Sequence, residues 1–204
     1  MKSTIDFDVP LVRELFDYAD GSLIWRRRPE SHFSSKGQCK AWNSKFHGKI
    51  AGVVAENGYV LIGVTIDGVE RKYKAHRIVW AWHTGVWPEN EIDHEDHDQG
   101  NNRIENLRDA SHQQNGRNLP ISSANTSGAT GVTWHKRAGR WLAQITVCGR
   151  NRYIGLFDTV DLASAAYQLE AAKAGFHPNH GKRTGAYQKG SALLQQRNER
   201  GVAA

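Results

Sequence analysis

The sequence predicts an α+β protein in which short antiparallel strands alternate with short helices. Residues 60–75, "VLIGVTIDGVERKYKA", alternate along the chain on either side of Asp67-Gly68, a pattern typical of a β-hairpin with a two-residue turn. Residues 131–157 contain three more strand-like runs, separated by "AG" and "GRN", and an alanine-rich helical stretch follows them. Each region therefore predicts a small sheet with a helix beside it.

The bulk composition fits a globular protein of 204 residues, with 39% hydrophobic and 24% charged residues. Its formal net charge of +6 favours a nucleic-acid partner, although a merely soluble basic protein has the same balance. The first residues carry acids where a signal peptide has its apolar stretch, and no apolar run reaches bilayer length, so we expect neither export nor membrane contact. The only cysteines, Cys39 and Cys148, indicate a reducing compartment and exclude a four-cysteine zinc site.

Two helices are predicted in the N-terminal half. "VPLVRELFDYADG", residues 9–21, is expected to form a helix that ends at Gly21. A polar, glycine-containing stretch then runs to about residue 49 without a periodicity that assigns it. "HRIVWAWHTG", residues 76–85, is expected to form a helix that ends at Gly85. The side chains expected on the buried face of this second helix are Ile78, Val79 and Trp82.

The C-terminal half is predicted to hold two further helices and a linker. Ser111 followed by Gln114 has the form of a capping box, so a helix is expected to start at Ser111. Residues 119–131, "LPISSANTSGATG", have the composition of a linker. Residues 159–175 are predicted to form a helix capped by its first residue. The apolar stripe expected to face the neighbouring sheet consists of Leu162, Ala165, Ala166 and Leu169.

An acidic loop interrupts this basic chain. Residues 89–98 hold six carboxylates and two histidines but no Lys or Arg, and such a cluster repels itself unless something positive lies among the carboxylates. Asp93 and His94 follow Ile92 at an expected strand end, which is a rigid place to present side chains. Asn115 lies in the capped helix, and carboxylate and amide oxygens suit Mg²⁺ or Mn²⁺ better than zinc. A solvated charged loop is the alternative interpretation.

Residues 76–118, "HRIVWAWHTGVWPENEIDHEDHDQGNNRIENLRDASHQQNGRN", closely resemble the HNH endonuclease motif of phage and intron-encoded homing endonucleases. The shared pattern is His-Arg, a short apolar helix, Asp-His, an Asp/Asn-rich loop, "NN", "NLR" and an Asn on a helix. The resemblance implies a ββα-metal (His-Me finger) fold, in which a hairpin and a helix hold one divalent cation, Mg²⁺ or Mn²⁺, against the DNA backbone. The third letter of the motif name is not literally met, because an Asn stands there.

Carried over position by position, the resemblance assigns Asp93 and Asn115 as metal ligands, His94 as the general base, and Asn106 as the brace of the loop that carries His94. A histidine of ordinary pKa is suited to take a proton from water near neutral pH, and a cation can steady the leaving oxygen. Structural roles beside the cation are expected for Glu95, Asp96 and Asp98, and His76 is expected to pack and form a hydrogen bond beside the motif, outside the catalytic set. His97 and His112 are expected to be solvent-exposed or stabilising, and not ligands. Contacts with the DNA backbone are expected from Arg103, Arg108 and Arg117.

Residues 127–172 resemble the APETALA-type, ethylene-response-factor DNA-binding domain through "SGATGV", "GRWLAQI", "YIGLFDT" and "AAYQLEAA". The resemblance implies a three-stranded antiparallel sheet laid in the major groove of DNA, with a helix packed behind the sheet. The plant pattern has arginines where this chain has Thr133, His135 and Thr146, so base specificity does not carry over.

Alternation along these strands separates a helix-facing set of side chains from a DNA-facing set. The helix-facing set is expected to be Val132, Trp134, Trp141, Ala143, Ile145 and Val147. Both tryptophans are therefore predicted to be core residues. Residues 121–160 hold five Lys or Arg and one acid, which favours a DNA-facing surface. The residues expected to contact DNA are His135, Arg137, Arg140, Gln144, Arg150 and Arg152.

These inferences predict a nuclease domain in residues 1–118 (motif core 76–118), a linker in 119–130, a DNA-binding domain in 131–180 and a basic, disordered tail in 181–204. The predicted function is divalent-metal-dependent hydrolysis of phosphodiester bonds in duplex DNA, by a cytoplasmic monomer in a prokaryotic cell or a phage-infected host, without a small-molecule cofactor. A DNA-binding regulator with a vestigial nuclease site is the alternative, and the intact Asp93, His94 and Asn115 argue against it. A zinc-stabilised structural module is weaker, because no cysteine lies near the loop.

Overall fold

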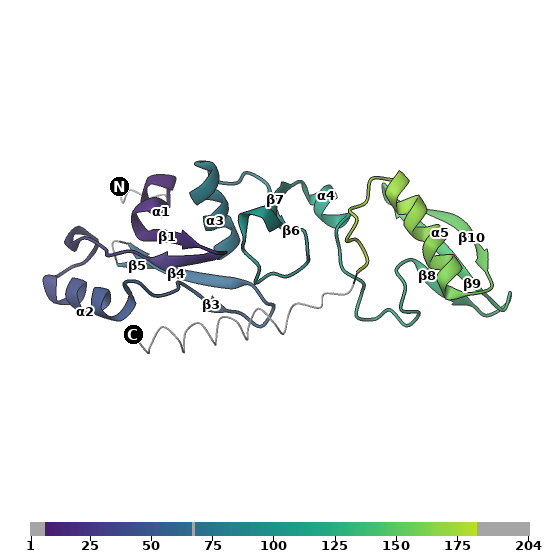
Figure 1. The fold of residues 1–204 in the computed structure, drawn as a ribbon, viewed down its shortest axis with the longest axis horizontal. Helices are drawn as coiled ribbons and strands as arrows, with labels where there is room; N and C mark the ends of the chain where they lie inside the picture. Colours follow the sequence, from purple (N-terminus) through teal and green to yellow (C-terminus); the bar gives the residue numbers. More distant parts are fainter. Residues whose placement is uncertain (1–6, 67, 183–204) are drawn as a thin grey trace. The chain divides into compact units, whose positions relative to one another are not determined.

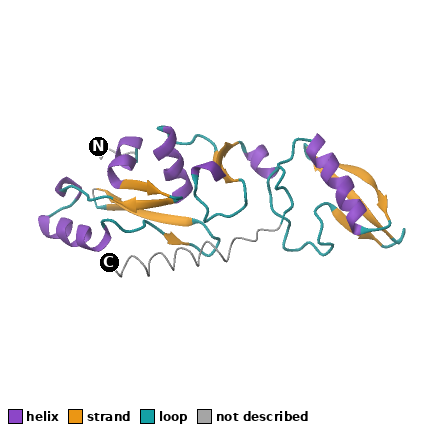
Figure 2. Cartoon of the chain, in the orientation of Figure 1, coloured by secondary structure: helices purple, strands orange, loops and turns teal. Residues whose placement is uncertain are grey.

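The computed structural model describes residues 7–66 and 68–182 of the chain (Figure 1). Within these ranges the chain forms two compact units, the first ending at Ala110 and the second beginning at Ser111. Antiparallel sheets and short helices make up both units, so the expected α+β class is confirmed (Figure 2). The domain limits expected at residues 118 and 130 stay predictions, and the expected basic tail from residue 183 onward lies outside the described residues.

The N-terminal unit contains three α-helices among its described residues, together with several short antiparallel pairings of strands. Its elements, in chain order, are α1 (Val9–Leu15), β1 (Phe16–Ala19), β2 (Ser22–Trp25), η1 (Glu30–His32), α2 (Lys36–Phe46), β3 (Val53–Val54), β4 (Val60–Ile66), β5 (Val69–Lys74), α3 (Ala75–Thr84), β6 (Glu91–His94), η2 (Ile104–Asn106) and β7 (Leu107–Ala110). In the described part of the chain, no helix has both the length and the apolar character needed to cross a membrane.

The expectation of one helix up to Gly21 is wrong in its second half. α1 ends at Leu15, and β1 and β2 then form a hairpin whose turn residues, Asp20 and Gly21, have φ angles of 48° and 80°. Two positive φ angles in a two-residue turn match the right-handed twist of paired strands. Pairing Phe16 with Trp25 brings their rings to 4.5 Å between centroids, and this buried aromatic contact outweighs the helical pattern.

The central hairpin and the helix that follows it are confirmed. β4 pairs with β5 from Leu61 opposite Lys74 to Ile66 opposite Val69. α3 ends at Gly85, whose φ of 76° is the left-handed conformation typical of a helix C-terminus. The apolar core of this unit gathers side chains from α1, α3 and the strands around them: Val12, Leu15, Phe16, Leu23, Ile62, Val64, Ile78 and Val79 are among its most buried members.

The unassigned stretch after β2 folds into η1 and α2. Ser35 caps α2 by accepting a hydrogen bond from the backbone N–H of Gln38. Asn43 is the buried residue of α2, and its amide group bonds both the N–H and the carbonyl oxygen of Arg28 at 2.9 Å. These two bonds fasten α2 to the segment that carries Arg28.

The C-terminal unit is a three-stranded antiparallel sheet with a long helix packed against it, as expected. Its described elements are α4 (His112–Gly116), β8 (Val132–His135), β9 (Arg140–Val147), β10 (Arg150–Phe157) and α5 (Val160–Lys173), and the strand order is β10-β9-β8. Ser111 and Gln114 form the expected capping box at the start of α4, and Thr159 caps α5. Figure 2 shows α5 lying across the strands of this sheet.

The predicted buried stripe of α5 is wrong. The helix buries Ala163, Tyr167 and Ala171, while Leu162 and Leu169 are 56% and 59% exposed. Residues spaced by four lie on one helix face, and two alanines on that face let the helix approach the sheet closely, with the Tyr167 ring filling the space between. Sequence alone favours the larger leucines, but close packing against a small sheet favours the smaller side chains.

One of the two tryptophans expected in the core is also misplaced. Trp141 is half-buried and packs against the cluster of Val132, Ala143 and Ala163. Trp134 pairs with Trp141 in register and meets its ring edge-on at 5.1 Å, but remains 49% exposed. Alternation assigns the correct face, yet Trp134 lies one residue before the end of β8, where Trp141 covers only part of its ring.

Gly131 gives a direct test of this packing. Its φ is +70°, and a Cβ there would overlap the ring of Tyr167 and lie 2.6 Å from the carbonyl oxygen of Gln144. Gly139 has a φ of +62°, but a Cβ added there would meet no other atom within 4 Å. We expect Gly139→Ala to cost about 1 kcal/mol of unfolding free energy through backbone strain, and Gly131→Ala about 3 kcal/mol or more because it adds a steric clash. Urea unfolding of both variants measures this difference, and equal losses would contradict the packing.

Candidate active site

The acidic loop is held between two short paired strands. β6 and β7 pair antiparallel, with Asp93 opposite Arg108 and His94 opposite Leu107. The backbone pairing extends one step further, because Glu95 N donates to the carbonyl oxygen of Asn106 at 3.0 Å. Asp93 and His94 are thus presented at the end of a strand, as the sequence predicts.

His94 is buried, and Asn102 holds its ring in place. The Nε2 atom of His94 lies 3.0 Å from Oδ1 of Asn102, which is also buried. Since an amide oxygen only accepts, Nε2 carries a hydrogen and the lone pair of the neutral ring lies on Nδ1. Burial lowers the pKa of His94, although the hydrogen bond with Asn102 and the carboxylates of Asp96, Asp93 and Asp98 act in the opposite direction. The neutral ring is the form that can accept a proton.

Two further rings pack beside His94. His76 at the start of α3 meets it edge-on with 4.9 Å between centroids, and the Tyr59 centroid is 6.0 Å from that of His94. Burial, together with smaller contributions from His94, Lys74 and Arg77, lowers the pKa of His76 to about 2. Burial raises the pKa of Tyr59, with smaller contributions from Asp93 and Glu91. All three rings are therefore uncharged near neutral pH.

Asp93 forms a two-point ion pair with the residue opposite it in the ladder. Its Oδ2 atom accepts hydrogen bonds from Nε of Arg108 at 3.0 Å and from Nη2 of Arg108 at 2.7 Å. The Asp93 side chain is nearly buried, so the guanidinium provides local compensation for its charge. Arg108, which the sequence suggests as a DNA contact, is committed to Asp93 in this structure.

Asn106 ties the loop together from within. Its amide oxygen accepts from Asp96 N at 3.1 Å, and its Nδ2 donates to Oδ1 of Asp96 at 2.8 Å and to the carbonyl oxygen of Asn101 at 2.9 Å. Asp96 also accepts from Asp98 N and from Nδ2 of Asn101. Asp96 is therefore a structural acceptor, and Asn106 and Asn101 both cross-link the loop that carries His94.

Asn115 belongs to the second compact unit. It lies in α4, where its backbone N–H donates to the carbonyl oxygen of Ser111, and its side chain is half-buried. Among the described residues no three His, Cys, Asp or Glu side chains cluster as a metal ion would require. The donor chemistry still fits a hard cation, because Asp93 offers a carboxylate and Asn115 an amide oxygen. A cation bound by Asp93 would share that carboxylate with Arg108.

The strand register sorts the residues expected to contact DNA into two groups. Directly paired residues of an antiparallel sheet project to the same side. His135 pairs with Arg140, and Gln144 with Tyr153, on the face away from α5. Arg150 and Arg152 pair with Val147 and Ile145, whose side chains pack toward α5, and Arg152 lies 3.7 Å from Glu170 of that helix. Arg137 is exposed in the turn between β8 and β9.

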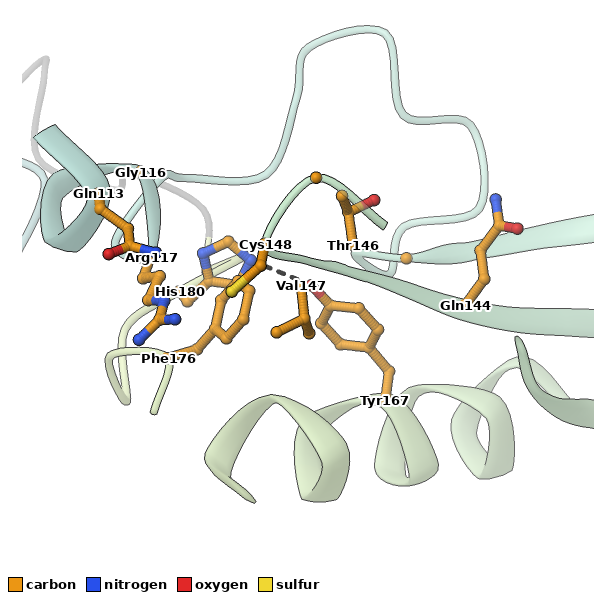
Figure 3. A pocket seen from close by; sticks show the side chains of 12 residues that line it. Gln113, Gly116, Arg117, Gln144, Thr146, Val147, Cys148, Tyr167, Phe176 and His180 are labelled. Carbon is orange, nitrogen blue, oxygen red and sulfur yellow. Dashed lines mark hydrogen bonds between the residues drawn. The ribbon is translucent and has the colours of Figure 1, made fainter. Parts of the chain in front are cut away.

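A cavity of about 750 Å³ lies within the second unit (Figure 3). Arg117, Gln144, Tyr167 and His180 line it, and Nε2 of His180 is 3.1 Å from the hydroxyl oxygen of Tyr167. The Arg117 guanidinium stands 5.8 Å from the centroid of Phe176. Two residues that the sequence predicts to contact DNA, Arg117 and Gln144, therefore line the same cavity.

Sequence reasoning misses Asn102 and Tyr59, and it expects His76 to pack beside the motif without naming the ring that it meets. Asn102 is the second letter of "NN", so its place in the motif is visible but its bond to His94 is not. His76 and Tyr59 precede the loop by many residues and reach His94 only through the packing of α3 and the start of β4. On the sheet, Tyr153 pairs with Gln144 and is 67% exposed. An aromatic residue on the outer face of a strand is the signal that could have identified Tyr153 as a candidate DNA contact.

A buried histidine beside a carboxylate, in an asparagine-braced loop between two strands, defines a candidate hydrolytic site of the HNH class. The sequence profile of the HNH endonuclease family matches residues 73–117, the stretch that holds His94 and its partners. The chain is also 31% identical over 100 residues to protein 3.8 of Escherichia phage T7, covering 47% of this chain and 83% of that protein. The chain belongs to the HNH endonuclease family, and the resemblance seen in the sequence is confirmed.

Other similarities are shorter or weaker. The AP2-like ethylene-responsive transcription factor TOE2 of Arabidopsis thaliana and the APETALA2-like protein 2 of Oryza sativa subsp. indica are each 46% identical over 43 residues, or 21% of this chain. The chain spans 9% and 10% of their lengths. A structure described as "DNA binding and cleavage by the HNH homing endonuclease I-HmuI" matches 81% of this chain and 84% of its own at 19% identity, with a TM-score of 0.39, too low to carry an argument.

His76 makes the stability of this site depend on pH. The pKa of His76 is about 6.5 in the unfolded chain and about 2 in the folded chain. Below pH 6.5 the unfolded chain therefore binds a proton that the folded chain does not bind. Folding stability should therefore fall as pH decreases, by about 1.4 kcal/mol per pH unit from this group. We expect His76→Phe to reduce the loss between pH 7.5 and pH 5 by about 2 kcal/mol in urea unfolding followed by tryptophan fluorescence. The same loss in both proteins would contradict a buried, neutral His76.

Proposed function

We propose that this protein is a divalent-metal-dependent DNA endonuclease that hydrolyses phosphodiester bonds in duplex DNA. The observation that carries the proposal is the bond between His94 Nε2 and Asn102, which directs the lone pair of a buried, neutral imidazole to Nδ1. That ring stands beside Asp93 in the stretch matched by the HNH family profile. Membership of the family and the form of the site point to the same chemistry.

In this mechanism His94 is the general base. Nδ1 takes a proton from a water molecule as the water oxygen attacks the phosphorus atom, and the bond from phosphorus to the leaving 3′ oxygen breaks, that oxygen taking a proton from solvent. Asn102 stabilises the resulting imidazolium through its acceptor oxygen on Nε2–H. Asn106 is a positioning residue, because its bonds to Asp96 and Asn101 hold the loop that sets the angle of His94. Burial of His94 keeps the base free of a proton at pH values somewhat below the ordinary pKa of histidine.

Asp93 would hold the cation, Mg²⁺ or Mn²⁺, through its carboxylate, and Asn115 stays a ligand predicted from the motif. Such an ion supplies Lewis-acid stabilisation of the phosphate and of the leaving oxygen when it is bound. Arg108, held against Asp93 at 2.7 Å, orients the carboxylate, and it offers a second positive charge to an approaching phosphate. The cation and the guanidinium together offset the acidic loop.

The second unit supplies binding to duplex DNA through the open face of its sheet. His135, Arg140 and Gln144 lie on that face, and Tyr153 and Asn151 extend it on β10. A strand-borne face of this kind can enter the major groove and read base edges with amide and guanidinium groups. We propose that the protein acts as a monomer in the cytoplasm of a prokaryotic or phage-infected cell.

The catalytic assignment is tested by His94→Ala in a plasmid-nicking assay with Mg²⁺ or Mn²⁺. We expect the variant to lose about 10²- to 10⁴-fold in cleavage rate, the usual contribution of a general base, while still binding duplex DNA. A chelator should abolish nicking by the wild type. His112→Ala, which removes an exposed histidine of the same motif region, is the matched control and should cleave at the wild-type rate. A wild type that binds duplex DNA and never nicks it would establish a regulator instead.

The proposal that the open face of the sheet binds DNA is tested by comparing residues on the two faces of β9 and β10. Tyr153→Ala and Gln144→Ala should each weaken duplex binding by about 1–3 kcal/mol, because each removes a side chain from the open face. Arg152→Ala removes a positive charge from the helix-facing side, where Glu170 lies, and should change affinity much less. Fluorescence anisotropy at one fixed salt concentration measures all three. A larger loss for Arg152→Ala than for Tyr153→Ala would place the DNA on the other side.

A further inference from the structure

A second cavity lies in the N-terminal unit, apart from the residues around His94. It has a volume of about 810 Å³ and lies between η1, one side of α2 from Gln38 to Lys45, and the end of β4. Its lining residues include Arg28, Phe33, Gln38, Trp42 and Lys45. Thr65 lines one side of the cavity. None of these side chains takes part in the proposed catalytic chemistry.

Arg28 is the unusual member of this lining. It is 3% exposed, and its guanidinium carbon stands 4.9 Å from the ring centroid of Phe33 and 5.0 Å from that of Trp42. Nη2 donates to the carbonyl oxygen of Thr65 at 2.8 Å, and Nε donates to Nδ1 of His32 at 3.4 Å. Two aromatic rings and two fixed acceptors therefore hold the guanidinium in one orientation.

No ion pair compensates this buried charge within the described chain. Arg28 forms no salt bridge with a described carboxylate, and Glu14 acts on it from beyond the ring of His32, whose Nε2 lies 3.3 Å from Oε1 of Glu14. Nη1 has no hydrogen-bond partner among the described residues. Burying a guanidinium without a bonded anion is costly, and buried charges are normally paired. The cavity beside Arg28 is where an anion would complete the arrangement.

The surroundings of the cavity are strongly basic. Residues 26–49 hold seven Lys or Arg and a single acid, Glu30. Lys45 lines the cavity and Lys40 stands on the same helix outside it. Ser34 and Gln38, at the capped N-terminal end of α2, add polar groups to the lining. A helix N-terminus also favours a negative ligand, which adds to the buried arginine.

We propose that this cavity binds a phosphate group of the DNA backbone, with Arg28 as its buried anchor and Lys45 as its outer donor. A phosphate oxygen would accept from Nη1 of Arg28, while the lysine ammonium supplies a second charge to the same group. The phosphodiester is the favoured anion because a continuous basic segment suits a polyanion better than a small free ion. The choice of DNA as the source of the phosphate rests on the proposed nuclease function.

The β4–β5 hairpin relates this cavity to the site of cleavage. Thr65, near the turn, accepts from Arg28, while Tyr59, just before β4, packs beside His94. Six residues of extended chain separate them, which corresponds to about 20 Å at roughly 3.3 Å per residue. One DNA strand advances about 3.4 Å per base pair, so the anchored phosphate would lie roughly six base pairs from the bond that is cut.

The proposal is tested with the full chain and a long fluorescent duplex of arbitrary sequence, without divalent ions. Lys45→Gln should weaken binding several-fold and reduce the slope of log affinity against log salt by about 0.9, the loss of one phosphate contact. Lys40→Gln is the matched control on the same helix and should leave both quantities unchanged. Arg28→Lys keeps the charge but loses the planar donor set, and should also weaken binding. Melting curves identify any variant that fails to fold.

A second arm adds inorganic phosphate to the same proteins and follows the melting temperature. Equal duplex affinity and salt slope for wild type and Lys45→Gln would overturn the proposal, and a wild type that binds no duplex would overturn it as well. Stabilisation of the wild type by phosphate without any change in the DNA affinity of Lys45→Gln would show a free-anion site and overturn the DNA assignment. Nicking assays on the same samples judge the nuclease function separately, because duplex binding is measured without metal.

Discussion

The candidate site depends on hydrogen bonds that hold an acidic loop rigid against the repulsion between its carboxylates. Six carboxylates between residues 89 and 98 repel one another, and free solvation would leave the loop open. The carboxylate of Asp96 instead accepts hydrogen bonds from Asp98 N, Asn101 Nδ2 and Asn106 Nδ2. These three bonds stabilise the turn. β6 and β7 close the loop at its base, and Asp93 is paired with Arg108 inside that ladder. Once these bonds are made, His94 and Asn102 can be buried together, which the open loop would not allow.

Local signals predict the elements of the site well, because they depend on near neighbours. The hairpin around Gly68, the end of α3 at Gly85 and the capping box of Ser111 are all confirmed, since each follows from backbone conformation or from a hydrogen bond three residues away. The motif identifies His94 for the same reason. The environment that buries His94 is different. His76 and Tyr59 reach it through the packing of α3 and the start of β4, and no spacing in the chain encodes that contact.

The errors share a physical cause in the choice between faces. Hydrophobic strength favours Leu162 and Leu169 as the buried stripe of α5, whereas close approach to a three-stranded sheet selects Ala163, Tyr167 and Ala171. The DNA contacts of the second unit stay predictions, for which charge alone makes every arginine an equal candidate. The register then places Arg152 on the helix side. Which face a residue occupies is set by the partner strand, and an isolated strand sequence carries only its alternation.

Charge is distributed over the chain according to what each surface must hold. The loop around His94 is acidic, which favours a cation and disfavours any phosphate held by the loop alone. The segment after β2 is basic, and it buries Arg28 where no described carboxylate pairs with it. A buried charge that the protein does not neutralise destabilises the free fold, so its retention favours a ligand that supplies the missing anion. The two regions lie at opposite ends of the β4–β5 hairpin, about 20 Å apart by strand length. One contact allows a duplex to pivot, but the two proposed contacts on a single hairpin would define the direction in which it runs past His94. In the proposed function the hairpin would then orient the DNA, and the loop beside it would carry the chemistry.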